Sequence, residues 1–245
     1  MIAHLGMYDR EETAAANDRF WAAIRNRLGA GPDHLTRDAD FWDVWQSPDL
    51  LFSQTCGMPY RTRLHGKVAL IGTPDYGLPG CPPGHYASVF VARREDAGSL
   101  DQFSGRRFAY NEALSQSGWA APTTHMREKS IAFGDLVPTG GHLLSAKAVA
   151  EGLADFAALD GLTWEMIRRY DGLAADLVEI ERTKPTPTLP FITALGRDTD
   201  RLFSAIAEAI SDLAPDDKET LHLKGMIRIP AEEYLAVPTP EPPAT

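Results

Sequence analysis

The sequence predicts an α/β protein of two lobes joined by two hinge crossings. Short apolar runs alternate with amphipathic stretches along most of the 245 residues, which is typical of strands alternating with helices. Stretches rich in glycine or proline at 76–86 and 182–190 interrupt this alternation. They divide the chain into a discontinuous first lobe, 1–83 with 186–236, and a second lobe, 84–185. A ligand cleft is expected between such lobes.

The first lobe begins with an apolar, strand-like run over residues 2–8. A helix is predicted over 11–29, because its apolar residues recur at helical spacing and Gly29 is a residue that commonly follows the last turn. The remaining predicted elements are a short helix with Phe41, Trp42 and Trp45 at helical spacing, strands at 50–55, 67–74 and 191–196, and a helix from 198 to 213 capped by Asp198 or Asp200.

The second lobe repeats the alternation of strands and helices. Strands are predicted at 87–93, 106–110, 130–137, 154–160 and 175–181, and helices from about 115, from 142 and over 161–170. The proline-rich residues 237–245 are predicted to form a disordered tail.

Composition excludes several classes of function. The net charge of −10 and the absence of a basic run argue against binding to nucleic acid or to an anionic membrane surface. No apolar run approaches the ~20 residues that span a bilayer, so membrane insertion is not expected. The first residues do not resemble a secretory signal, so we expect either a cytoplasmic protein or the mature form of an exported one.

The two cysteines, Cys56 and Cys81, do not have the spacing of a zinc site. A disulfide between them would suit an exported protein, and two separate thiols are the alternative. Neither these nor other residues point to a metal or a cofactor.

A polar turn joins the predicted strand at 106–110 to the following helix. Ser115, Gln116 and Ser117 stand at the start of that helix, where unpaired N–H groups and the helix dipole favour an anion. Gly118 would let a ligand group approach the backbone. Ordinary capping by Ser115 is the simpler alternative.

Two further turns have the same position between a strand and a helix. His142 follows Gly140 and Gly141 at a predicted helix start, where a positive charge is unfavourable, so a neutral imidazole or a bound anion is expected. A surface histidine beside a glycine-rich loop is the simpler alternative. Asp160 ends an apolar strand and is also explained as a helix cap. If the three turns lie on one edge of the sheet, their polar groups would converge there. Ligands of open α/β sheets bind at this edge, outside the carboxyl ends of the strands.

The segments FAYNEALSQSGW, TGGHLLSAKAVAEGLADFAALD and RTKPTPTLPFIT together resemble the phosphonate-binding family of ABC-transporter substrate-binding proteins, a group that takes up phosphate, phosphite and phosphonate. The likeness extends from about Met7 to Ile210. It implies the two-lobed periplasmic-binding-protein type II fold, a small anionic or polar solute as ligand, and an ABC permease as partner. It also implies a monomeric protein located in the periplasm if a signal peptide has been removed, and otherwise in the cytoplasm.

The resemblance also implies which residues bind the ligand. The family's helix start D-P-x-S-T-S-G-Y matches 111–119, its G-S-H turn matches 140–142, and its aspartate after the next strand matches Asp160. Gln116, Gly141 and Trp119 depart from the family residues, and each departure is expected to alter the pocket. The complete set of candidate ligand-binding residues is Tyr8, Gln54, Thr55, Tyr110, Asn111, Ser115, Gln116, Ser117, Gly118, His142 and Asp160.

The leading interpretation is a solute-binding protein that is not an enzyme. Two alternatives use the same fold. A cytoplasmic enzyme of the menaquinone-dehydratase or thiamine-pyrimidine-synthase type would use His142 and Asp160 as acid and base. A ligand sensor would instead couple its closure to a partner protein. The sequence lacks a nucleophile-elbow, Walker or dinucleotide-binding pattern that would support an enzyme.

Overall fold

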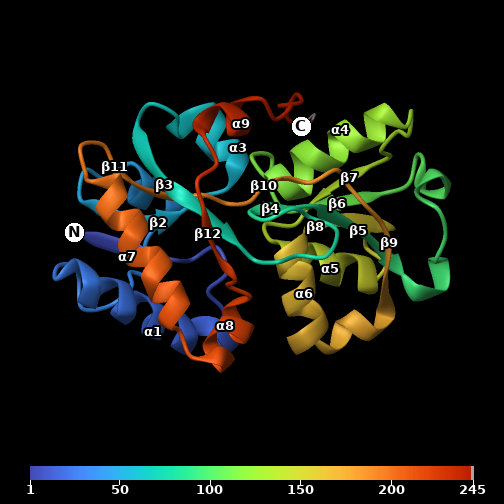
Figure 1. The fold of residues 1–245 in the computed structure, drawn as a ribbon. Helices are drawn as coiled ribbons and strands as arrows, with labels where there is room; N and C mark the ends of the chain where they lie inside the picture. The colour runs from blue at the N-terminus through green and yellow to red at the C-terminus, as the bar shows by residue number, and fades with distance from the viewer. Residues whose placement is uncertain (244–245) are drawn as a thin grey trace. The chain divides into compact units, whose positions relative to one another are not determined.

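The computed structural model describes residues 1–243, which divide into two compact units (Figure 1). Unit 1 contains Met1–His85 and Pro187–Ala236, and unit 2 contains Tyr86–Thr186 and the chain from Val237 onward. Short strands β4 (His85–Tyr86) and β10 (Thr186–Pro187) pair with each other where the first two passages between the units occur. A third passage, after Ala236, was not predicted.

Unit 1 is built on a five-stranded sheet in the order β1-β2-β11-β3-β12. The strands are β1 (Ile2–His4), β2 (Leu50–Gln54), β3 (Val68–Asp75), β11 (Phe191–Ala194) and β12 (Gly225–Ile227). β1 runs parallel to β2, whereas β11 is antiparallel to both β2 and β3. β1, β2 and β3 therefore have their carboxyl ends at one edge of this sheet.

Helices cover the sheet of unit 1. α1 (Glu11–Leu28) and α7 (Thr199–Asp212) lie side by side (Figure 1), and α8 (Pro215–Leu221) packs on α1. α1 ends at Gly29 in the left-handed conformation and α7 is capped by Asp198, as expected from the sequence. The predicted short helix is α2 (Phe41–Trp45), and the unit also contains α3 (Gly57–Pro59), the π-helical turn η1 (Tyr60–Leu64) and α9 (Ala231–Leu235).

Unit 2 has its own five-stranded sheet, in the order β7-β6-β8-β5-β9. The strands are β5 (Ser88–Arg93), β6 (Phe108–Tyr110), β7 (Leu136–Pro138), β8 (Phe156–Asp160) and β9 (Leu177–Arg182). The helical segments are η2 (Arg94–Asp96), η3 (Leu100–Phe103), η4 (Gln116–Ala120), α4 (Ala121–Glu128), α5 (His142–Ala150), α6 (Gly161–Tyr170) and η5 (Gly172–Asp176).

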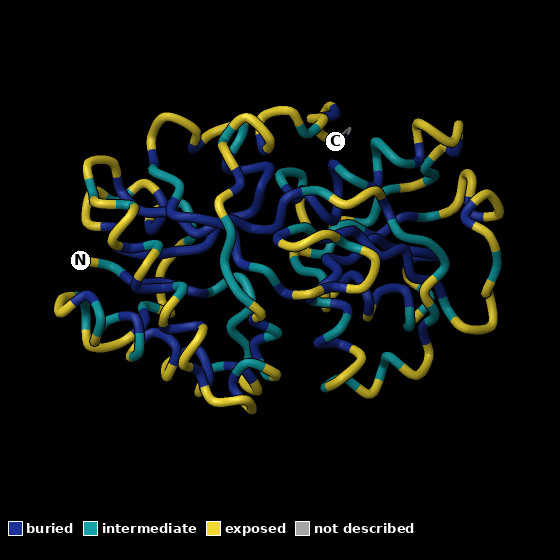
Figure 2. The backbone as a smooth tube through the Cα atoms, viewed as in Figure 1, coloured by how far each residue is buried: buried dark blue, intermediate teal, exposed yellow. Residues whose placement is uncertain are grey.

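Alternation along β5 gives unit 2 two apolar layers. Val89 and Val91 pack in one cluster with α5 and α6, and Phe90 and Ala92 pack in another with Trp119 and α4. Successive side chains of a strand point to opposite faces, so helices on both faces bury the central strands β5 and β8. Buried residues, dark blue in Figure 2, include most of the central strands of each unit together with the inner faces of the helices.

One predicted strand is much shorter than expected. Within 130–137 only Leu136 and Val137 belong to β7. The chain before them includes Ser130 with a left-handed φ of 60°, and the Gly134 N–H donates to the distant Arg106 carbonyl at 2.8 Å, ahead of β6. The apolar residues of this stretch still enter the core: Ile131 belongs to the cluster of Phe90 and Trp119, and Phe133 packs against that cluster, stacked on Phe108.

The predicted disordered tail is partly corrected. Over 237–243 the chain belongs to unit 2, with Pro240 and Pro243 buried and the Glu241 carbonyl accepting a hydrogen bond from Trp119. The last two residues of the predicted tail, 244–245, lie outside the described residues. Among residues 1–243, no helix is long and apolar enough to cross a membrane.

Candidate functional site

Three polar turns of unit 2 lie at one edge of its sheet. β6 runs parallel to both β7 and β8, so the carboxyl ends of these neighbouring strands point the same way. Residues 111–118 follow β6, residues 139–142 follow β7, and Asp160 is the last residue of β8, directly before α6. Ligands of open α/β sheets bind outside such strand ends, which makes this edge the candidate site of unit 2.

The first turn leads into a helix through Ser115. Its hydroxyl accepts a hydrogen bond from the Gly118 N–H at 2.9 Å, which is a helix cap. The π-helical turn η4 then continues directly into α4. Ser115, Gln116 and Ser117 are each only 2% exposed, so these polar residues are held in a fixed arrangement.

The second turn is bonded to the first. The hydroxyl of Ser117 lies 2.9 Å from Nε2 of His142, and the Gly140 N–H donates to the Asn111 carbonyl at 2.8 Å. Gly140 has a φ of +85°, a conformation that favours glycine. One side-chain contact and one backbone hydrogen bond therefore join two turns that are separated by some 25 residues.

His142 is neutral at physiological pH. Burial lowers the pKa of its imidazole to about 4, because the charged form would lose its hydration. Its Nδ1 atom is buried and makes no hydrogen bond to any described residue. This agrees with the expectation that a histidine at a helix start stays uncharged.

Close packing explains why position 118 is a glycine. A Cβ atom at this position would lie 1.9 Å from Asn111 Oδ1 and 3.2 Å from His142 Cε1. The space that the sequence suggested for a ligand is thus filled by Asn111. Asn111 Oδ1 is itself buried, with no hydrogen-bond partner in the part of the chain described.

The turns rest on a small hydroxyl network that the sequence analysis missed. Thr139 donates through both its N–H and its Oγ1 to the Tyr110 carbonyl, at 2.9 and 3.0 Å, and its Oγ1 lies 2.7 Å from Ser145 Oγ. The sequence feature that could have identified Thr139 is its position directly after β7 and immediately before Gly140 and Gly141. Tyr110, which was predicted as a site residue, packs its ring 5.3 Å from that of Trp119.

Asp160 caps α6. Its carboxylate accepts hydrogen bonds from the N–H groups of Leu162 and Thr163, at 2.9 and 3.0 Å, and it is 3% exposed. The capping role that the sequence offered as an alternative is therefore present. A ligand role remains a prediction.

The candidates of unit 1 also gather at strand ends. Gln54 ends β2, and its Nε2 donates to the Tyr76 hydroxyl at 2.8 Å and to the Leu189 carbonyl at 2.9 Å. The ring of Tyr8 packs edge-on against that of Tyr76, with centroids 5.6 Å apart. Thr55 is fully buried, and its Oγ1 has no hydrogen-bond partner among the described residues.

Tyr76 was missed as a member of this group. The sequence analysis placed it at the start of a linker, because glycine and prolines follow it. Its position just after β3, the third strand with its carboxyl end at this edge, was the signal that could have identified it.

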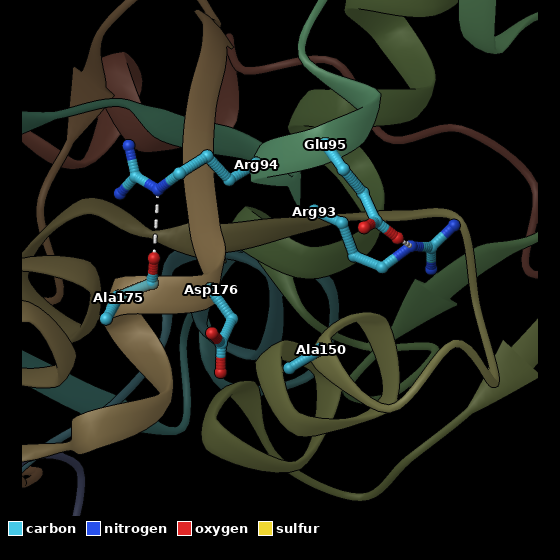
Figure 3. Close-up of a pocket in the computed structure, with 6 residues that line it drawn as sticks. All are labelled: Arg93, Arg94, Glu95, Ala150, Ala175 and Asp176. Atoms are coloured by element: carbon cyan, nitrogen blue, oxygen red, sulfur yellow. Dashed lines mark hydrogen bonds and ion pairs between the residues drawn. The ribbon is translucent and has the colours of Figure 1, made fainter.

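A separate hollow of about 450 Å³ lies on unit 2, lined by Arg93, Arg94, Glu95, Ala150, Ala175 and Asp176 (Figure 3). Its two guanidinium groups are already engaged by the protein. Arg93 donates to the Val149 and Ala154 carbonyls, and Arg94 donates to the Ala175 carbonyl. These arginines stabilise the fold, and we do not assign the hollow a ligand.

The structure assigns no disulfide to Cys56 and Cys81, and the bridge considered from the sequence stays a prediction. Cys56 is buried at the start of α3, and Cys81 is half-buried in the loop before β4. Residues 1–243 contain no cluster of His, Cys, Asp and Glu suited to a metal ion.

Comparison with known proteins gives one family match. A family model described as "ABC transporter, phosphonate, periplasmic substrate-binding protein" matches residues 50–234. No curated protein matches the chain.

Several solved structures are similar over nearly the whole chain. PhnD1 from Prochlorococcus marinus, in complex with methylphosphonate, has a TM-score of 0.70 at 15% identity, covering 95% of this chain and 94% of its own. A binding protein component of an ABC phosphonate transporter from Pseudomonas aeruginosa has a TM-score of 0.69 at 14% identity, covering 93% and 80%. XAC2383 from Xanthomonas citri, bound to ATP, has a TM-score of 0.68 at 18% identity, covering 96% and 95%. These likenesses confirm the predicted fold, that of the two-lobed periplasmic binding proteins.

Proposed function

Because this chain belongs to the phosphonate-binding family of periplasmic substrate-binding proteins of ABC transporters, we propose that it binds a small oxyanion-bearing solute, such as a phosphonate, phosphite or phosphate. It passes the bound solute to a membrane permease and carries out no reaction on it. Retention of a solute requires only that the ligand-bound state has the lower free energy, so no group has to act as an acid, base or nucleophile.

The observation that carries this proposal is the contact between Ser117 and His142 at the shared strand edge of unit 2. A neutral imidazole has one N–H, and when Nε2 holds it, that N–H donates to the Ser117 oxygen. The Ser117 hydroxyl hydrogen is then available to an oxygen of the ligand. Hydrogen bonds to a charged acceptor contribute about 1.5–3 kcal/mol each, which makes this hydroxyl a principal ligand group.

The candidate residues of unit 2 include no lysine or arginine, and His142 is neutral. Positive potential for an anion comes instead from helix starts. The helix η4–α4 begins at Gln116 and α5 begins at His142, so two helix N-termini adjoin the bonded turns. Each N-terminus is equivalent to roughly half a positive charge and presents N–H donors. Such a site is suited to a compact oxyanion.

A screen by thermal shift and calorimetry tests the proposal directly. The probes are phosphate, phosphite, methylphosphonate, 2-aminoethylphosphonate, methanesulfonate and ATP, the last because one similar structure contains it. A ligand at 100 times its dissociation constant should stabilise the protein by about 2.7 kcal/mol. Phosphorus NMR of the same samples over a day should show unchanged ligand.

Two results would contradict the proposal. One is a folded protein whose melting temperature no probe raises. The other is conversion of a phosphorus compound to a product, which would identify an enzyme and direct attention to His142 and Asp160. Ser117→Ala is the matched variant: a genuine site ligand binds it more weakly, whereas an ion bound elsewhere on the surface does not distinguish the two proteins.

A further inference from the structure

The end of the chain is attached to the helix that carries the candidate ligand-binding turn. Nε1 of Trp119 donates a hydrogen bond to the Glu241 carbonyl at 2.9 Å. Pro240 and Pro243, on either side, are buried, although the intervening Glu241 is exposed. This contact lies beyond the family match, which ends at residue 234.

Trp119 connects this contact to the turn. It directly follows Gly118, is 4% exposed, and packs its ring between those of Tyr110 and Phe133, with centroid distances of 5.3 and 5.8 Å. An indole has one polar atom, a donor, and a buried donor without an acceptor costs about 1–3 kcal/mol. The position and rotamer of Trp119 are therefore coupled to the presence of the Glu241 carbonyl.

The same contact accounts for a departure from the family pattern. Tryptophan stands where the resembling sequences have tyrosine, and we expected that change to alter the pocket. In the structure its polar atom is directed to the Glu241 carbonyl instead. The indole N–H supplies a donor to a backbone carbonyl that this chain places beside it.

We propose that residues 237–243 form a strap that positions the turn 115–119, with the Trp119–Glu241 hydrogen bond as its fastening point. Trp119 is a positioning residue, since it acts on Ser117 and Gly118 through the helix. The effect on ligand affinity rests on the function proposed above. The effect on the turn itself does not.

The strap is short and is also anchored at its other end. In unit 1, the Tyr234 hydroxyl donates to the Thr188 carbonyl at 2.9 Å and lies 2.7 Å from Thr73 Oγ1. Tyr234 is 1% exposed. Detachment would restore the backbone entropy of residues 237–243, so the strap is held by the Trp119–Glu241 hydrogen bond and by the burial of Pro240 and Pro243.

Hydrogen exchange of the ligand-free protein tests the strap. One variant ends at Ala236, and a second, Trp119→Phe, keeps an aromatic ring but removes the N–H. In both, the amides of 116–120 should exchange about two- to tenfold faster than in the parent chain, the factor that corresponds to a lost hydrogen bond of about 0.5–1.5 kcal/mol. Trp119→Phe should also raise exchange at Glu241. If truncation prevents folding, the point variant alone decides.

Trp21→Phe is the matched control. Trp21 is also buried, and its Nε1 donates to the Pro32 carbonyl at 3.0 Å, so the substitution removes the same kind of hydrogen bond from unit 1. It should leave exchange at 116–120 unchanged. Equal acceleration in this control, or unchanged exchange at 116–120 after truncation, would overturn the strap.

Calorimetry then measures how the strap affects the dissociation constant of the anion. The dissociation constant of the best anion from the screen should rise two- to tenfold in both strap variants and stay constant in Trp21→Phe. Unchanged affinity together with faster exchange would overturn the positioning role of the strap. If the parent chain binds no anion, the proposed function fails, and the exchange experiment still decides whether the strap holds the turn.

Discussion

Ser117 and His142 form a hydroxyl–imidazole pair of 2.9 Å that joins the turns after two parallel strands of unit 2. The pair places a hydroxyl at the start of one helix and an uncharged ring at the start of another. Each group constrains the other, since Ser117 engages Nε2 of the ring. The first predictions concern the two members of this pair.

Replacement of Ser117 by alanine should weaken binding of the oxyanion about tenfold or more, because a hydrogen bond to a charged group contributes about 1.5–3 kcal/mol. Isothermal titration calorimetry measures the change. Ser99→Ala is the control, because it removes a hydroxyl from an exposed position of the same unit. Equal affinity of the Ser117 variant and the parent would remove Ser117 from the site.

His142 should make the unfolding free energy depend on pH. Its folded pKa is lowered by burial to about 4, from an ordinary 6.5, so between these values the unfolded chain binds the proton that the native protein does not. The stabilisation is fully present above about pH 6.5 and is lost as the pH falls toward 4. The upper limit of this contribution is about 3 kcal/mol.

Urea unfolding at several pH values measures this dependence. His142→Asn should flatten the curve between pH 6.5 and 4 relative to the parent chain. His4→Asn is the comparison, because burial lowers the pKa of His4 as well. A His142 variant with the same pH dependence as the parent would show that the imidazole is not the group responsible.

Gly118→Ala should destabilise unit 2 by about 1–3 kcal/mol, the usual cost of overpacking. The added Cβ would lie 1.9 Å from Asn111 Oδ1, so the Asn111 side chain must move. Asn111→Ala in the same protein removes the obstructing atom and should recover part of the loss. Additive effects in this double-mutant cycle would be inconsistent with the contact.

Asp160 can be tested for capping and ligand binding separately. Asp160→Ala should lower the unfolding free energy by about 0.5–2 kcal/mol, since the N–H groups of Leu162 and Thr163 lose their acceptor. Asp160→Asn keeps an acceptor oxygen and should retain most of the stability. If Asp160→Asn nevertheless changes ligand affinity, the charge has a role in binding; unchanged affinity in this variant leaves the residue as a cap only.

The cysteines should behave as two thiols of different accessibility. A maleimide should label Cys81 in the native protein well before Cys56, which is 5% exposed. The intact mass should be the same with and without reductant. A difference of two hydrogens would establish the bridge considered from the sequence.

Local patterns in the sequence were sufficient to predict most elements. Gly29 ends α1 and Asp198 begins α7 because capping depends on residues next to each other in the chain. A continuous apolar run likewise predicted β5, since both faces of this strand are buried. The prediction of a strand over all of 130–137 failed because Ile131 and Phe133 reach the core from irregular backbone, and apolar composition does not distinguish that arrangement from a strand.

The sequence by itself thus determined most of the strands and helices and the polar turns between them, but not α8, β12 or α9. Only the tertiary structure decided which side chains meet: Ser117 with His142, Asn111 against Gly118, Gln54 with Tyr76, and Trp119 with the carbonyl of Glu241. The last pair is separated by 122 positions. Helix caps and periodicity are local and can be recognised from neighbouring residues, whereas these contacts depend on strand order and register, which the whole chain fixes as it buries its core.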